Sequence, residues 1–189
     1  MATKITQRSK LFQGKFISLW KTEFSGTDGK TYEWEWIRGK NFVVVLPLLD
    51  TTTVLLIKNF RVPIEQYVLD VPAGTIEEGA TPEETARREL TEEVGYTARK
   101  LIALPPVPHA PGNSSSMIYP FIATSLEKTR GQNLEATEDI EVVTMSVNEV
   151  LQTYRAGHDL LNLRVLSLIH VAVNDGLCTQ EAKKENVAD

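Results

Sequence analysis

The sequence predicts an α/β fold in which a mixed sheet is sandwiched between helices. Short apolar, β-branched segments recur along the chain, and segments with helix-start signals lie between and after them. The chain has 189 residues, of which 42% are hydrophobic. A chain of this size buries about two-thirds of its unfolded surface in one core, so a second full domain is not expected.

Residues 1–39 are expected to form a β-hairpin extension ahead of the main domain. Segments 16–24 and 31–37 have the composition of strands and are joined through Asp28-Gly29, a dipeptide that favours tight turns. In the second strand aromatic and polar residues alternate, so the aromatic side chains line one strand face. Packing in a core or a dimer explains such a row about twice as often as ligand stacking does. The aromatic residues are Tyr32, Trp34 and Trp36.

The main domain is expected to span residues 40–176 and to contain five strands. Their apolar, β-branched composition and the turn-forming residues between them indicate strands buried in a sheet. A proline-rich loop at residues 105–116 separates the last two strands from the others. The five segments are 41–49, 54–60, 67–71, 117–124 and 141–145.

Two helices are expected near the C-terminal end of this domain. A capping box formed by Ser146 and Glu149 opens a helix that ends near Gly157. Residues 160–173 are apolar enough for a largely buried second helix. The polar tail, residues 177–189, is expected to fray.

An earlier helix carries the most informative residues of the chain. It begins at Thr81, which is placed as an N-cap with Pro82 at the first helical position, and it ends at Gly95. An apolar stripe at every fourth residue leaves the acidic residues on other faces, and Glu89 and Glu93 are neighbours one turn apart. The stripe consists of Ala86, Leu90 and Val94.

Carboxylates one turn apart repel each other unless a cation lies among them. Oxygen ligands with no Cys or His nearby suit Mg²⁺, for which Mn²⁺ is a possible substitute, rather than Zn²⁺. For an arbitrary acidic cluster, a solvated face is the better explanation by about three to one. The surrounding sequence decides between the two explanations.

The segment from Gly74 to Tyr96 resembles the signature of the Nudix hydrolases. Eight positions match it at fixed spacing, which is far more specific than a lone glycine motif. Ala80 departs from the pattern because it stands where the family has its first Glu, and altered loop stability rather than lost chemistry is expected. Glu77, Glu78 and Glu83 are candidates to replace that carboxylate. The matching residues are Gly74, Arg88, Glu89, Leu90, Glu92, Glu93, Gly95 and Tyr96.

The resemblance implies an α/β/α sandwich and a divalent metal site on the signature helix. Glu89 and Glu93 would be the main ligands, Glu92 a further one, and the backbone carbonyl of Ala73 another oxygen donor. Arg88 would fix the signature loop rather than touch substrate.

A general base is expected in the acidic loop that precedes the last predicted strand, residues 133–139. Glu138 is the preferred candidate, because enzymes of the ADP-ribose and nucleotide-sugar branch, which the chain resembles, carry their catalytic Glu in such a loop. Glu135 and Asp139 remain competitors. A solvated acidic turn is about as probable for any one of the three considered alone.

The resemblance to this branch also implies a set of substrate-binding residues. Arg61 would hold the diphosphate with its planar guanidinium. Trp34 and Phe16 would stack the base, Glu35 would accept a hydrogen bond from its amino group, and Pro111 occupies a position associated with ADP-ribose specificity. The N-terminal hairpin would form a homodimer.

Composition excludes several classes of partner. A net charge of −5 without basic clusters argues against nucleic acid, and no apolar segment is long enough to span a membrane. The single cysteine, Cys178, permits no internal disulfide and fits a reducing compartment, so a cytoplasmic protein is expected. The three histidines are dispersed and are interpreted as structural or surface residues.

These features together predict a Mg²⁺-dependent pyrophosphohydrolase that splits ADP-ribose or a nucleoside diphosphate sugar into a nucleoside monophosphate and a sugar phosphate. One alternative is a hydrolase of another nucleotide sugar or dinucleotide, such as GDP-mannose or NADH. The other is a non-catalytic nucleotide sensor on the same fold, although loss of the metal-binding carboxylates would be its expected mark.

Overall fold

The computed structural model describes residues 3–129 and 131–180, and the chain divides into two compact units. Unit 1 combines residues 1–42 with 106–119, and unit 2 combines residues 43–105 with 120–189. The prediction of a fraying tail falls largely on residues 181–189, which lie outside the described part.

Cys178 is buried and free, and burial raises the pKa of its thiol.

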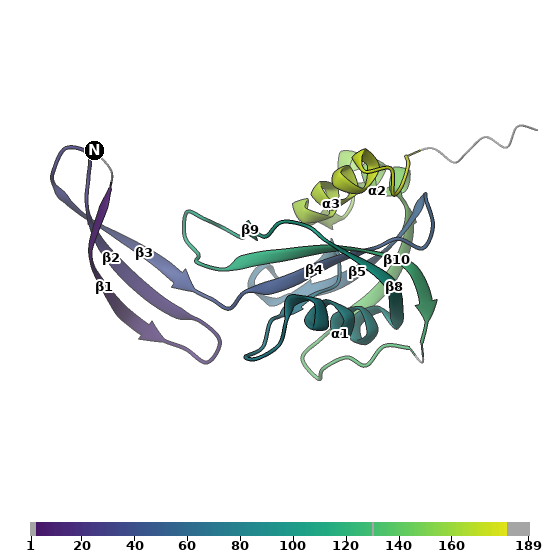
Figure 1. Ribbon diagram of the computed structural model, residues 1–189, viewed down its shortest axis with the longest axis horizontal. Helices are drawn as coiled ribbons and strands as arrows, with labels where there is room; N and C mark the ends of the chain where they lie inside the picture. Colours follow the sequence, from purple (N-terminus) through teal and green to yellow (C-terminus); the bar gives the residue numbers. More distant parts are fainter. Residues whose placement is uncertain (1–2, 130, 181–189) are drawn as a thin grey trace, which may run out of the picture. The chain divides into compact units, whose positions relative to one another are not determined.

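Unit 1 is built on a three-stranded antiparallel sheet in the order β1-β2-β3 (Figure 1). Asp28-Gly29 turns the chain between β2 and β3 as predicted, with Gly29 at φ 78°. The hairpin prediction missed the first strand, because its polar and exposed side chains lack the apolar alternation that marks a strand. The strands are β1 (Lys4–Gln13), β2 (Ser18–Ser25) and β3 (Thr31–Arg38).

The second segment of unit 1 is the predicted proline-rich loop. It contains a two-residue strand, β9 (Val107–Pro108), that pairs with the start of β10 (Met117–Lys128). Beyond β9 the loop is fixed to the end of β3, since the Ile37 N–H donates to the Asn113 carbonyl over 2.8 Å and Ser115 N–H donates to the Ile37 carbonyl over 3.1 Å.

Unit 2 contains two sheets where one mixed sheet was expected. One has the order β7-β4-β10-β8 and the other β11-β5-β6-β12. β6 and β12 run parallel, whereas β5 pairs antiparallel with both β6 and β11. β8, which sequence patterns missed, follows the first helix directly. Strands not yet bounded are β4 (Phe42–Pro47), β5 (Thr53–Arg61), β6 (Gln66–Asp70), β7 (Ala73–Thr75), β8 (Tyr96–Ala103), β11 (Ile140–Ser146) and β12 (Leu160–Leu161).

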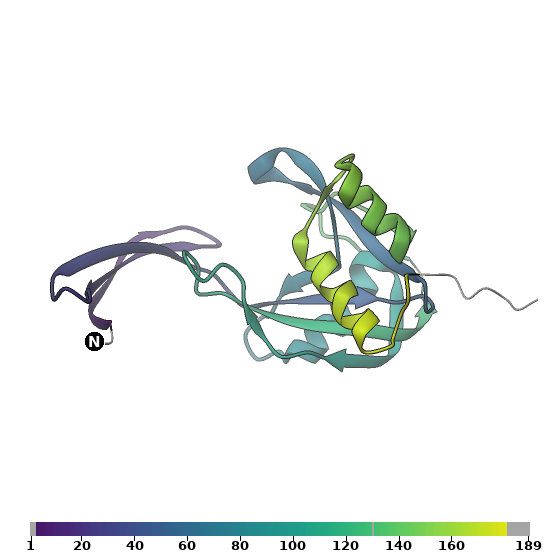
Figure 2. The same cartoon turned by 90° about the horizontal axis from the view of Figure 1, so that it is seen from above.

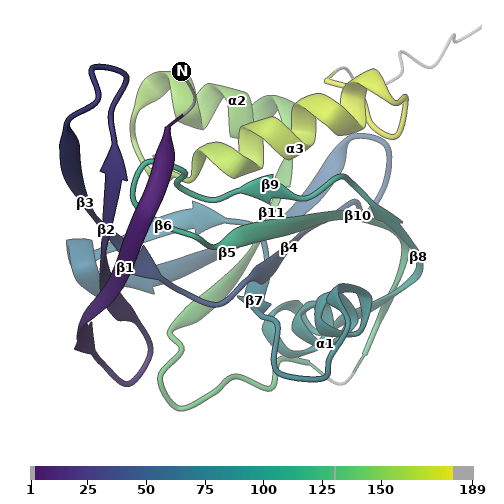
Figure 3. The ribbon, with the colours of Figure 1, turned by 60° about the vertical axis from the view of Figure 1, so that its left-hand side comes forward.

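Helices cover unit 2 on both sides, as the fold class requires. α1 (Pro82–Val94) lies on one side of the strands, and α2 (Val147–Ala156) and α3 (Leu163–Asn174) lie on the other (Figures 1, 2 and 3). A short 3-10 helix (Val62–Ile64) follows β5. The last helix begins three residues later than predicted, because residues 160–161 pair with β6 instead. No helix in the described residues is long and apolar enough to cross a membrane.

The core of unit 2 lies between these helices and the strands. Central residues of β4 and β5 and the inner faces of the helices are excluded from solvent, which places the apolar surface where it stabilises the fold. The largest fully buried side chains include those of Leu46, Leu55, Leu56, Ile57, Leu90 and Ile122.

Candidate active site

The site in unit 2 is organised by α1, whose ends form as the sequence predicts. The Thr81 hydroxyl accepts from the Glu84 N–H over 3.2 Å, and the Glu84 carboxylate accepts from the Thr81 N–H over 2.8 Å. Gly95 closes the helix at φ 74°, where its N–H donates to the carbonyls of Leu90 and Thr91. These caps fix the helix between two sharp boundaries.

Glu89 and Glu93 lie on the buried face of α1. They are 6% and 3% exposed, and they share this face with Ala86, Leu90 and Val94. A solvated acidic face is therefore excluded for this pair. Buried carboxylates are rare without a partner, so their position is itself a sign of function.

Strand β7 packs directly against these two carboxylates. A Cβ added at Gly74 would lie 1.8 Å from Glu89 Oε1, so only glycine permits this close approach. One residue earlier, the Ala73 N–H donates to Glu93 Oε2 over 2.7 Å. The close approach of β7 to Glu89 thus explains why glycine is required at the first position of the signature. The backbone of Ala73 lies beside the proposed ligand Glu93.

Burial dominates the electrostatics of the two carboxylates. It raises the pKa of Glu93 to about 8, because the hydrogen bond from Ala73 offsets only part of the cost of desolvation and the charges of Glu89 and Glu138 add to it. Burial also raises the pKa of Glu89, although Arg88 opposes the shift. Desolvation therefore outweighs the nearby positive charges of Arg88 and Arg61 at these two carboxylates.

Arg88 bridges two carboxylates of its own helix. Its Nη2 donates to Glu89 Oε1 over 2.5 Å and its Nη1 to Glu92 Oε2 over 2.6 Å. Among the candidates to replace the missing Glu at position 80, Glu83 pairs with Arg87 rather than with Arg88. In this structure Arg88 thus pairs with two of the metal-ligand candidates.

The acidic loop is attached to the C-terminal end of α1. Asn133 N–H donates to the Glu92 carbonyl over 2.8 Å, and Gln132 Nε2 donates to the Glu93 carbonyl over 2.8 Å. Glu138 is close enough for its charge to raise the pKa of both Glu89 and Glu93.

The two competitors of Glu138 differ from it in their surroundings. Asp139 Oδ2 accepts a hydrogen bond from the Tyr67 hydroxyl over 2.5 Å. Glu135 donates its N–H to Glu138 Oε2 over 2.8 Å, and its charge acts less on Glu89 and Glu93 than that of Glu138 does. Of the three, Glu138 has the electrostatic contact with α1.

The donor set on α1 fits a hard divalent cation by its chemistry. Glu89, Glu92 and Glu93 offer only oxygen, and burial disfavours the charged forms of Glu89 and Glu93, a cost that such an ion would offset. Within residues 3–129 and 131–180, no three Asp, Glu, His or Cys side chains converge closely enough to hold an ion as they stand. Arg88 instead contributes the positive charge between Glu89 and Glu92.

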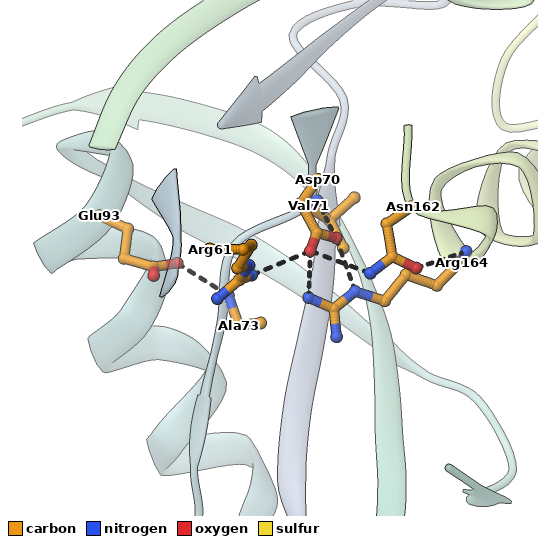
Figure 4. Close-up of polar contacts among 7 residues, drawn as sticks. All are labelled: Arg61, Asp70, Val71, Ala73, Glu93, Asn162 and Arg164. Atoms are coloured by element: carbon orange, nitrogen blue, oxygen red, sulfur yellow. Dashed lines mark hydrogen bonds and ion pairs between the residues drawn. The ribbon is translucent and has the colours of Figure 1, made fainter. Parts of the chain in front are cut away.

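Arg61, at the end of β5, belongs to a polar cluster that sequence reasoning missed. Its Nη2 donates over 3.0 Å to Asp70, a fully buried carboxylate at the end of β6 (Figure 4). Asn162 and Arg164 donate to the same carboxylate from the start of α3. No spacing rule connects these positions, because they meet only through the fold.

The remaining predicted binding residues lie in unit 1. Trp34 Nε1 donates to the Gly112 carbonyl over 2.7 Å, and both residues line a cavity of about 610 Å³. Phe16 is 81% exposed and is not among the lining residues. Glu35 lies on the opposite face of β3 from Trp34, since alternate side chains of a strand point to opposite sides. The lining also includes Trp20, Phe24, Trp36, Arg38 and Pro111.

Unit 2 is thus an α/β domain with buried carboxylates on its signature helix. The NUDIX domain family model matches residues 39–163, and the chain belongs to this family. An ADP-ribose pyrophosphatase from Bacillus subtilis is 32% identical over 79% of this chain and 81% of its own. An ADP-sugar pyrophosphatase from Mus musculus is 32% identical over 78% of this chain and 75% of its own.

A solved structure has the same fold. The crystal structure of an ADP compounds hydrolase matches 93% of this chain and 97% of its own with a TM-score of 0.79, at 22% identity. The predicted α/β Nudix fold is therefore confirmed.

Proposed function

We propose that this protein hydrolyses the diphosphate bond of ADP-ribose or of nucleoside diphosphate sugars, releasing a nucleoside monophosphate and a sugar phosphate. The observation that carries this proposal is the buried pair Glu89 and Glu93 against the backbone of Ala73 and Gly74, with Glu138 nearby. Relatives named for hydrolysis of ADP-ribose and ADP-sugars support the substrate class.

Each residue of unit 2 has a distinct part in this proposal. Glu89, Glu92 and Glu93, with the backbone carbonyl of Ala73, would hold Mg²⁺ or Mn²⁺. When bound, the ion supplies positive charge for the diphosphate and acidifies a water molecule. Glu138 would act as general base and take up a proton from the attacking water. Arg61 binds the diphosphate through its guanidinium.

Arg88 has a supporting part. It holds Glu89 and Glu92 in place and stays off the substrate. Because it neutralises these carboxylates before a cation arrives, it also limits the repulsion that would otherwise separate them.

Unit 1 would bind the base. Trp34 presents a half-exposed indole, held by its hydrogen bond to Gly112, as a stacking surface, and Pro111 lines the same cavity. Phe16 would be a second aromatic side chain that stacks on the base, and Glu35 would accept a hydrogen bond from the base. In this proposal a second copy of the chain contributes both residues. The proposal therefore includes a homodimer, and a cytoplasmic location consistent with a single unpaired cysteine.

A substrate panel tests the reaction. ADP-ribose, GDP-mannose, UDP-glucose, NADH and nucleoside triphosphates are incubated with enzyme and Mg²⁺, Mn²⁺ or EDTA, and the products are separated. Fastest turnover of ADP-ribose or UDP-glucose to a nucleoside monophosphate and a sugar phosphate, lost in EDTA, is the expected result. Preference for GDP-mannose or NADH would identify a hydrolase of another nucleotide sugar or of a dinucleotide. Binding without turnover would indicate a nucleotide sensor.

The Trp34→Ala variant tests the base site separately. It should raise KM for ADP-ribose by the equivalent of about 1 to 3 kcal/mol, the range for a base stacked on an aromatic side chain, with a smaller change in turnover. Tyr32→Ala is the matched control, because Tyr32 lies on the same strand, donates to Asp28 and does not line the cavity. Normal KM in a destabilised Trp34→Ala variant would assign Trp34 to packing.

A further inference from the structure

The chain segment before α3 is fixed in register against the end of β6. Leu160 and Leu161 of β12 pair in parallel with Val68 and Leu69. Asn162 N–H then donates to the Leu69 carbonyl over 2.9 Å. This register brings the first residues of α3 to Asp70, the last residue of β6.

Two side chains from this segment clamp the Asp70 carboxylate. Asn162 uses both ends of its amide: Oδ1 accepts from the Arg164 N–H as the N-cap of α3, and Nδ2 donates to Asp70 Oδ2 over 3.2 Å. Arg164 donates in bidentate fashion, from Nε to Oδ1 over 2.6 Å and from Nη2 to Oδ2 over 2.5 Å. Such paired bonds have both strength and a fixed direction.

Arg61 shares the same carboxylate but faces a different way. It makes a single hydrogen bond to Asp70, and its side chain is 38% exposed where that of Arg164 is 16% exposed. In Figure 4, Arg61 lies between Asp70 and the contact of Ala73 with Glu93. Arg164, the less exposed of the two, therefore holds Asp70 in place, whereas Arg61 is directed toward the carboxylates of α1.

Competition for Asp70 controls how Arg61 is presented. The Asp70 carboxylate accepts from both guanidiniums, and its two oxygens cannot serve all the donors of two arginines. Because Arg164 occupies both oxygens of Asp70, Arg61 is limited to one bond, and the rest of its guanidinium is open to an anion. Without Arg164, Asp70 would be free to bind Arg61 bidentately and hold it back from the site.

We propose that Arg164 and Asn162 are positioning residues for diphosphate binding, which act through Asp70 to hold Arg61 in its outward, single-bonded state. The proposal rests on the proposed function, in which Arg61 binds the diphosphate. It assigns part of the substrate affinity to the start of α3, which lies outside the signature sequence and contributes no group to the substrate itself.

A double-mutant cycle with Arg61→Ala and Arg164→Lys tests the proposal in the full-length enzyme. Lysine keeps the charge but cannot bind both oxygens of Asp70 in the same fork. Arg164→Lys should raise KM for ADP-ribose about tenfold with little change in kcat, because the loss concerns binding. In the Arg61→Ala background, the same substitution should change KM by no more than about twofold, because the two residues act as one unit.

Two further variants separate positioning from folding. Asn162→Ser retains a good N-cap and adds no charge, but it loses the amide donor to Asp70, so it should raise KM while α3 stays folded. Asp159→Asn is the matched control, since it breaks the exposed ion pair with Lys58 near the same segment without touching Asp70, and KM should not change. Thermal unfolding is measured for every variant.

Several results would overturn the proposal. If the Arg164→Lys effect on KM persists in the Arg61→Ala background, Arg164 acts independently of Arg61. If KM is unchanged while stability falls, the clamp is structural only.

The same cycle is repeated on the affinity for ADP with Mg²⁺ by calorimetry, which requires no turnover. If ADP binds but ADP-ribose is not hydrolysed, the proposed function is wrong. The coupling between Arg61 and Arg164 in ADP binding then still tests whether Arg164 positions Arg61. If neither nucleotide is bound, both fail.

Discussion

Two sets of buried carboxylates in unit 2 differ in how completely they are neutralised. Asp70 accepts hydrogen bonds from two guanidiniums, one amide and one backbone N–H. Glu93, equally inaccessible, accepts one backbone N–H, and its pKa rises to about 8. A fully paired carboxylate fixes a conformation, whereas a poorly paired one costs stability and retains the capacity to bind a cation.

The largest effect is expected where neutralisation is least complete. Glu93→Gln keeps the shape of the side chain and removes the charge that would bind the cation, so turnover should be abolished with little change in fold. Steady-state assays at saturating Mg²⁺ and circular dichroism measure the two properties. Glu83→Gln, on the exposed side of the same helix, is the control, and near-native turnover of Glu93→Gln would disprove the metal assignment.

The acidic loop gives the next largest effect. Glu138→Gln should lower kcat by about 10²- to 10⁴-fold, the usual contribution of a general base, and leave KM nearly unchanged. Glu135→Gln is the matched control, because it lies in the same turn. Should that variant be the inactive one, the role of base passes to Glu135.

Asp70 should affect stability rather than chemistry directly. Asp70→Asn leaves two guanidiniums around a neutral, buried amide, and breaking a buried ion pair in this way costs about 3 to 5 kcal/mol of unfolding free energy. Urea titration measures this loss. Asp159→Asn, which removes an exposed ion pair, should cost less than about 1 kcal/mol. Equal losses of unfolding free energy in the two variants would show that the buried ion pairs of Asp70 stabilise the fold no more than the exposed pair of Asp159 does.

A further expected effect is a pH dependence of the stability of the metal-free protein. The pKa of Glu93 is about 8 in the folded state against 4.5 ordinarily, so the folded chain retains a proton that the unfolded chain releases within this window. The contribution of Glu93 to stability therefore falls as pH rises from about 4.5 to about 8.

Glu93→Gln removes this titration and should gain stability relative to the wild type as pH rises. Thermal unfolding in EDTA at pH 5 and pH 8.5 measures the gain. A stability difference between the two proteins that stays constant with pH would show that Glu93 is not buried as a carboxylic acid.

Local signals in the sequence predicted the helices of unit 2 well. The Thr81 and Ser146 capping boxes form, and Gly95 and Gly157 end their helices in the left-handed conformation. Such signals act within one helical turn, so sequence is sufficient to recognise them.

Other features depend on contacts that sequence patterns do not encode. Periodicity assigned Glu89 and Glu93 to faces away from the apolar stripe, because charged residues are not counted as buried. The bonds from Arg164 to Asp70 join positions far apart in sequence. β1 has few apolar residues and was missed for that reason.

Gly74 has a consequence for how this site tolerates mutation. Because a Cβ there would meet the Glu89 carboxyl at 1.8 to 2.0 Å, the strand facing the helix has no room for side-chain variation at this point. What borders Glu89 is peptide backbone, whose carbonyl and amide groups persist under every point substitution compatible with the fold. Point substitutions can therefore remove the carboxylates of this site, but they hardly change the backbone groups that border Glu89.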